Sequence, residues 1–99
     1  MNQSKATRTV TVTNRAGLHA RAALAVVNLV RRYHAKVELI KDRRRVDSVD
    51  MLQMLSLGAA QGEELTVEAT GEEAEAAVQA LAQLFADKFN EEDQQPVGK

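Results

Sequence analysis

The sequence of 99 residues contains no cysteine and no tryptophan, and aromatic residues make up only 3% of it. Without cysteine the chain can form neither a disulfide framework nor a thiolate metal site, and it has no thiol nucleophile. With so few aromatic side chains it has almost no surface on which nucleic-acid bases could stack. A cysteine-free composition is typical of a reducing compartment, so we expect a cytoplasmic protein.

Long hydrophobic runs and an excess of charge of one sign are also missing. No stretch of about 18 apolar residues could span a bilayer, and the start of the chain lacks the apolar segment of a secretory signal. Lys and Arg total 13 against 14 Asp and Glu, which gives a net charge of -1. Such a chain has no overall positive potential that would attract nucleic acid or an anionic membrane, so we expect neither partner. Any anion must be bound by a local group of residues.

What the sequence does contain is the composition of one ordinary globular domain. Hydrophobic residues make up 44% of the chain and charged residues 27%, and a chain of this length can bury about 60 to 65% of its unfolded surface. We expect a flexible N-terminus over residues 1–7, a folded domain over 8–89 and a disordered tail over 90–99, where no periodic apolar face remains. A monomer is the simplest expectation.

Hydrophobic periodicity predicts four strands and three helices. Alternating residues predict strands at 8–13, 36–41, 45–48 and 63–69, and helical spacing predicts helices starting at 20, at 51 and after 70–73. The short second helix has Asp50 at its capping position, and residues 70–73 read as a capping box for the last helix. The order βαββαβα predicts an α/β (α+β) open-faced sandwich, with a four-stranded antiparallel sheet and helices on one face. Periodicity alone leaves a ferredoxin-like topology open.

Residues 17–21 place His19 where a loop becomes the first helix. A helix start offers unpaired N–H groups and a partial positive charge, and Arg21 adds a cation in the first turn, so the segment suits phosphate. A neutral imidazole can take up a phosphoryl group and release it again. Taken alone, however, a histidine here is more often a helix cap. No second His, Asp or Glu near it in the sequence completes a catalytic or metal-ligating set, so we expect no metal and no cofactor.

Two segments together resemble the HPr family of phosphocarrier proteins. Residues 17–23, GLHARAA, are similar to the family's active-site segment, and residues 54–62, MLSLGAAQG, to its second-helix segment. The resemblance covers residues 8–89 and implies the HPr-like fold. It implies that Nδ1 of His19 accepts a phosphoryl group from phosphorylated enzyme I and passes it to an enzyme IIA domain. It also implies that Arg21 stabilises the phosphate, with Gly17 and Ala20 forming the loop and helix start around it. Such a protein is a stoichiometric carrier and not an enzyme.

The resemblance further implies that partners dock on the short second helix. Met51, Leu52 and Leu55 match the docking positions of the family. The sequence is compatible with this role, because the helix is apolar on too many sides to bury all of its residues against one sheet. For each of the three residues, burial in the core is the alternative.

Asp50 departs from the family pattern, since regulated members carry at this position a serine that HPr kinase phosphorylates. We therefore hypothesise that this chain is not controlled by such a kinase. A permanent carboxylate also suggests an alternative function, a regulatory binding module of the same fold that contacts regulatory proteins. Ser48, two residues away, is better interpreted as a strand-end or capping hydroxyl than as a substitute. Ala22 replaces a proline that favours helix entry, and His34 matches no functional position.

Overall fold

A computed structural model describes residues 4–91 of the chain as a sheet with helices packed on it. The strands are β1 (Lys5–Thr11), β2 (Lys36–Lys41), β3 (Arg44–Asp47) and β4 (Glu64–Thr70). The helices are α1 (Ala20–Val30), α2 (Met51–Ser56) and α3 (Ala74–Ala86), and a 3-10 turn, η1 (Lys88–Asn90), follows them. Within this described part, no helix is long and apolar enough to cross a membrane.

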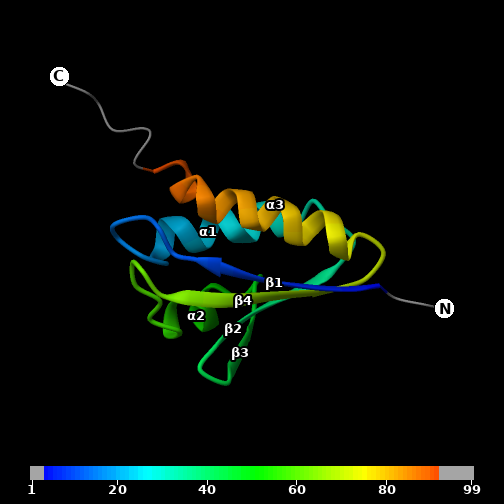
Figure 1. Cartoon of the computed structure of the whole chain (residues 1–99), viewed down its shortest axis with the longest axis horizontal. Helices are drawn as coiled ribbons and strands as arrows, with labels where there is room; N and C mark the ends of the chain where they lie inside the picture. Colours follow the sequence, from blue (N-terminus) through cyan, green and yellow to red (C-terminus); the bar gives the residue numbers. More distant parts are fainter. Residues whose placement is uncertain (1–3, 92–99) are drawn as a thin grey trace.

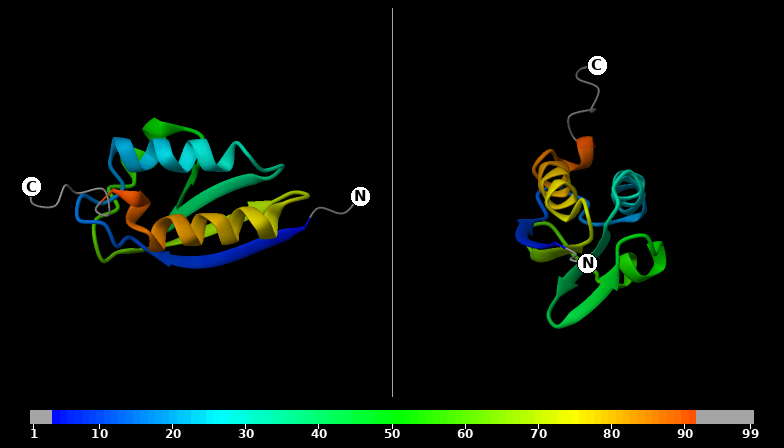
Figure 2. Two further views of the ribbon diagram at one scale, coloured as in Figure 1. Left: turned by 90° about the horizontal axis from the view of Figure 1, so that it is seen from above. Right: turned by 90° about the vertical axis from the view of Figure 1, so that its right-hand side faces the viewer.

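The sheet has the strand order β1-β4-β2-β3, and all neighbouring strands are antiparallel (Figure 1). The helices lie together on one side of it, as the end-on view in Figure 2 shows. This arrangement confirms the predicted open-faced sandwich. Because β4 lies between β1 and β2, the sheet also settles the topology that periodicity left open.

The core lies between the inner face of the sheet and the apolar stripes of α1 and α3. Strand β4 alternates between buried and more exposed positions along its whole length, which is the pattern of a sheet with one wet face. The largest fully buried apolar side chains are those of Phe85, Leu39, Met54, Leu65, Leu81, Val12, Val26, Val37 and Val67. The stripe predicted for the first helix, Ala23, Val26, Val27 and Val30, is buried.

Several predicted boundaries differ from the structure: β1 ends at Thr11 and not at residue 13, and β3 and β4 are each shifted by one residue. Two larger differences have a clear physical cause. Strand β1 begins at Lys5, inside the segment expected to be a flexible N-terminus, because its first residue pairs with Thr70 of β4. The same pairing keeps Thr70 in the sheet, so the predicted capping box at 70–73 does not form. Instead Glu73 caps α3 without a side-chain bond to it, and its carboxylate accepts a hydrogen bond of 2.7 Å from the backbone N–H of His34.

The chain leaves α3 through a left-handed turn. Lys88, Phe89 and Asn90 have φ angles of 57°, 55° and 61°, a conformation that costs an L-residue about 1–2 kcal/mol. Burial of Phe89 offsets this cost, because its ring packs edge-on against Phe85 with the centroids 4.8 Å apart. Asn90 and Glu91 were expected in the disordered tail but belong to this ordered turn. Residues 92–99 of the predicted tail lie outside the described residues.

Candidate functional site

His19 occupies the N-cap of α1, and its ring is reachable from solvent. Its backbone is extended (φ -92°, ψ -173°), and Nδ1 accepts a long hydrogen bond of 3.4 Å from the backbone N–H of Arg21. The side chain is 38% exposed. The capping role and the carrier role that the sequence left as alternatives are therefore compatible, since a capping nitrogen that faces solvent and backbone N–H groups can also receive an anion.

The loop before His19 is held by the segment that follows α2. The N–H of Leu18 donates to the carbonyl of Ala59 over 2.9 Å. Gly17 has φ +73°, and a Cβ built on it would lie 2.6 Å from that same carbonyl oxygen. The two segments that carried the family resemblance thus contact each other, and Gly17 is required both for its backbone angle and for the close approach.

A carboxylate that sequence reasoning missed lies against the histidine. Glu91 Oε2 is 2.8 Å from Nε2 of His19, and Glu91 Oε1 accepts a 3.0 Å hydrogen bond from Nδ2 of Asn14. The sequence analysis looked for a second His, Asp or Glu only close to His19 in the sequence and so missed Glu91, which is 72 residues away. Figure 2 shows the reason, since the end of α3 returns beside the start of α1.

Asn14 connects the loop before His19 to Glu91. Its side chain is fully buried, and Nδ2 donates to the carbonyl of Gly17 over 2.8 Å as well as to Glu91. The sequence signal for Asn14 was an amide side chain in the loop shortly before a glycine. No local signal pointed to Glu91.

The start of α1 is suited to a negatively charged group. Ala20 is the first helical residue, and the first turn contains no acidic side chain. Arg21 is exposed, and within residues 4–91 its guanidinium has no ion-pair partner. An anion attached to Nδ1 of His19 would therefore meet backbone N–H donors and a cation that is not already engaged.

The short helix α2 divides its apolar residues between the core and the surface. Leu52 is 80% exposed and Leu55 37% exposed, Met51 is half-buried, and Met54 and Leu57 are buried. Leu24 of α1 and Val49 are also exposed, which the sequence analysis did not anticipate. Figure 2 shows α2 beside α1, and the two helices contact each other, so this apolar surface lies next to the helix that His19 caps.

Asp50 and Ser48 have different environments. Asp50 is the N-cap of α2, and its carboxylate accepts a 3.1 Å hydrogen bond from the N–H of Gln53, as its position predicted. The side chain of Ser48 is completely buried, and its hydroxyl has no hydrogen-bond partner within the described part of the chain. A kinase could not reach that hydroxyl in the folded protein.

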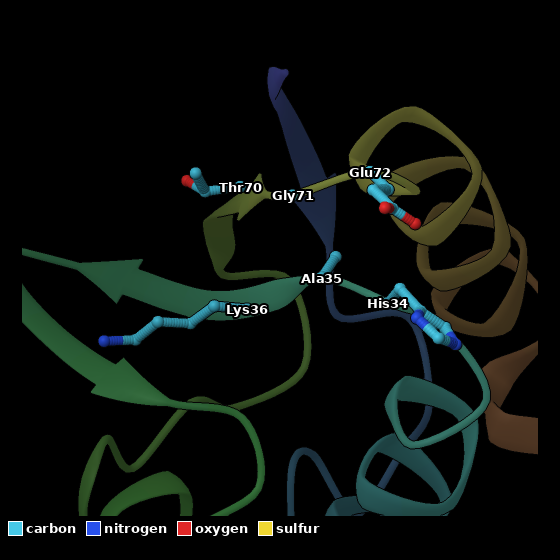
Figure 3. A pocket seen from close by; sticks show the side chains of 6 residues that line it. All are labelled: His34, Ala35, Lys36, Thr70, Gly71 and Glu72. Atoms are coloured by element: carbon cyan, nitrogen blue, oxygen red, sulfur yellow. The ribbon is translucent and has the colours of Figure 1, made fainter. Parts of the chain in front are cut away.

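A hollow of about 470 Å³ lies at the opposite end of α1 (Figure 3). It is lined by His34, Ala35, Lys36, Thr70, Gly71 and Glu72. Figure 3 shows the side chains of Lys36 and Glu72 pointing away from each other, so they do not converge on a ligand. Among residues 4–91 there is also no cluster of His, Cys, Asp or Glu that could hold a metal ion.

Comparison with known proteins gives matches along nearly the whole domain. A family model described as the PTS HPr component phosphorylation site matches residues 6–87. The chain is 38% identical over 85 residues to phosphocarrier protein HPr of Treponema pallidum, covering 86% of this chain and 97% of that protein. It is 35% identical over 86 residues to phosphocarrier protein NPr of Escherichia coli K12, covering 86% and 96%. Among solved structures, HPr-C-His from Thermoanaerobacter tengcongensis superposes with a TM-score of 0.83 at 31% identity, covering 87% and 97%.

Proposed function

This chain belongs to the HPr family of phosphocarrier proteins of the phosphotransferase system, and from this premise we propose that it carries its phosphoryl group on Nδ1 of His19. The protein is a non-catalytic carrier, which is a substrate of enzymes and not itself an enzyme. The observation that carries the proposal is the exposed ring of His19 at the N-cap of α1, with Nδ1 directed at a backbone N–H.

Transfer to His19 moves one phosphoryl group from a nitrogen or oxygen atom of the donor to Nδ1 of the imidazole. The step uses no cofactor. The lone pair of Nδ1 forms the new N–P bond while the bond from phosphorus to the donor breaks, and the electron pair stays with the donor. The N–H of Arg21 then donates to a phosphate oxygen in place of Nδ1, and the guanidinium of Arg21 balances the added charge. Donation to an acceptor is the reverse sequence. Gly17 and Ala20 serve this step by fixing the loop and the helix start.

The family implies enzyme I and enzyme IIA partners, and we place their docking surface on α2. Exposed Leu52 and Leu55 together with half-buried Met51 form an apolar surface on α2, and Leu24 of the neighbouring helix α1 is also exposed. Exposed apolar groups around a reactive side chain are what a partner must cover to exclude water during transfer. A carboxylate at Asp50 supports the absence of kinase control, and the lack of cysteine supports a cytoplasmic location. A monomer is the simplest expectation for its oligomeric state.

Labelling from phosphoenolpyruvate tests the acceptor residue. The chain is incubated with labelled phosphoenolpyruvate and enzyme I, and acid-labile phosphate is measured on the wild type, on His19→Ala and on His34→Ala. We expect label on the wild type and on His34→Ala, and none on His19→Ala. The His34 variant is a matched control because the chain has 2 histidines. Label that survives His19→Ala would contradict the proposal, and an unlabelled wild type would favour the regulatory binding module.

A further inference from the structure

The carboxylate of Glu91 uses both of its oxygens on the active-site loop. Oε2 contacts Nε2 of His19 at 2.8 Å, and Oε1 accepts from Nδ2 of Asn14 at 3.0 Å. The Glu91 side chain is only 12% exposed. An amide anchored at the carbonyl of Gly17 therefore orients a largely buried carboxylate toward one particular nitrogen of the ring.

This contact decides which ring nitrogen carries the proton. A carboxylate only accepts hydrogen bonds, so Nε2 must be the donor. At the other side of the ring, the N–H of Arg21 is itself a donor, so Nδ1 must be the acceptor. Both contacts favour the same neutral tautomer, in which Nδ1 holds the lone pair that attacks phosphorus.

The contact is compatible with a phosphorylated ring. Glu91 lies against Nε2 and so leaves Nδ1 open to a phosphoryl group. When the N–P bond forms at Nδ1 while the proton stays on Nε2, the ring acquires positive charge, which an adjacent carboxylate stabilises. The carboxylate of Glu91 therefore stabilises the positively charged ring from the side opposite to the phosphoryl group.

The placement of Glu91 depends on the left-handed turn at the end of α3. The positive φ angles of Lys88, Phe89 and Asn90 reverse the chain, and buried Phe89 fixes the turn in the core. Unfavourable backbone conformations persist where surrounding structure holds them, and they concentrate at functional sites. Here the turn brings a residue from the end of the domain to a histidine near its beginning.

We propose that Glu91 is a positioning residue, which holds the proton of the neutral His19 ring on Nε2 and so keeps Nδ1 as the nucleophile. This inference rests on the proposed role of His19 as acceptor. Glu91 acts on the transfer step through the imidazole ring and does not contact the phosphoryl group.

The first measurement is the tautomer itself. Nitrogen NMR of the ¹⁵N-labelled full chain, at a pH above the ordinary titration range of histidine, identifies the protonated ring nitrogen of His19. We expect the Nε2–H form in the wild type and in Glu72→Ala, a control that removes an exposed carboxylate at the other end of the molecule. In Glu91→Ala the proportion of the Nδ1–H form should rise.

A second variant, Glu91→Gln, distinguishes the positioning role of Glu91 from a contribution to folding alone. Glu91→Gln preserves size but replaces one acceptor oxygen by an amide donor, so Asn14 and His19 compete for the remaining oxygen. The Nδ1–H proportion should rise here too, while the unfolding midpoint stays near that of the wild type. Transfer from enzyme I, measured at saturating protein, should slow by about tenfold in Glu91→Ala, the low end of the contribution of orienting carboxylates.

The two proposals fail in different ways. Absence of label from His19 of the wild type would contradict the proposed function. If the wild type is labelled on His19, but both Glu91 variants keep the wild-type tautomer and transfer rate, the role assigned to Glu91 is overturned.

Discussion

At the scale of single residues, Gly17 determines whether the loop before His19 can adopt its conformation. Its φ of +73° is unfavourable for any residue with a Cβ, and the Cβ would lie 2.6 Å from the carbonyl oxygen of Ala59. Gly58 provides a comparison within the same chain. Its φ is +62°, but nothing lies within 4 Å of the position of its Cβ. Comparing an alanine substitution at Gly17 with one at Gly58 therefore separates the cost of steric crowding from the cost of the left-handed backbone angle.

We expect Gly17→Ala to destabilise the protein more than Gly58→Ala. Gly58→Ala should lower the free energy of unfolding by about 1 kcal/mol through the left-handed backbone alone. Gly17→Ala adds the cost of moving the loop away from Ala59, so the loss should reach about 2–4 kcal/mol. Urea unfolding of both variants measures the difference. Equal losses would mean that the loop and the segment after α2 separate without cost.

At the scale of elements, α2 depends on groups outside itself. It has only 6 residues, and an isolated helix of that length is not stable in water. The carboxylate of Asp50 accepts a hydrogen bond from one of the first N–H groups of the helix, that of Gln53. At its other end, Lys41 donates to the carbonyl of Leu57 over 3.1 Å, and Arg44 to that of Ser56 over 2.6 Å. The β2–β3 hairpin thus supplies the cations that complement the C-terminal end of the helix.

The cap at Asp50 can be tested without touching the surface residues of α2. Asp50→Ala should lower the free energy of unfolding by about 1 kcal/mol, because the N–H of Gln53 loses its acceptor. Asp50→Ser should retain most of the stability, since a serine hydroxyl also caps. Thermal or urea unfolding of the two variants gives the comparison. A stable Asp50→Ala protein would show that the hairpin alone holds the helix.

The elements that the sequence predicted correctly are those whose signals are local. The strand at Lys36–Lys41 was predicted with its observed bounds because alternation and the following turn lie within a few residues. The capping box at 70–73 failed because pairing of Thr70 with two neighbouring strands overrides the local preference. For the same reason His19 could be identified from its position at a helix start, while Glu91 required knowledge of where the end of α3 lies.

At the scale of the whole molecule, a row of charges crosses the open face of the sheet. Arg45 of β3 donates to Glu38 of β2 and to Glu68 of β4, each over 2.8 Å, and Lys5 of β1 lies 3.7 Å from Glu68. Glu38 and Glu68 are directly opposite each other in the pairing of their strands. Like charges in this position repel, and the shared guanidinium of Arg45 compensates them. Arg45 therefore links β2, β3 and β4, and Lys5 extends the row to β1.

The contribution of this row of charges should be visible in how the free energy of unfolding changes with pH. Hydrogen bonding to Arg45 lowers the pKa of Glu68 from its ordinary value of 4.5. A carboxyl group whose pKa is lowered by folding stabilises the fold at pH above its unfolded pKa and loses that contribution as the pH falls through the folded value. Stability from this source should thus be complete at neutral pH and disappear in acid below the ordinary glutamate range. Added salt should reduce it, because these side chains are partly exposed.

Arg45→Gln should consequently lower the urea midpoint at pH 7, and its difference from the wild type should shrink in acid, where the carboxyl group of Glu68 becomes neutral and no longer repels Glu38. Arg8→Gln is the matched control, because Arg8 is an exposed strand arginine without an ion pair among residues 4–91. Urea midpoints of the three proteins across this pH range provide the measurement. If the Arg45 and Arg8 variants differ equally from the wild type at every pH, the row contributes nothing specific. A difference that belongs to Arg45 and vanishes in acid would mean that one exposed arginine couples the strands on the face that the helices leave open.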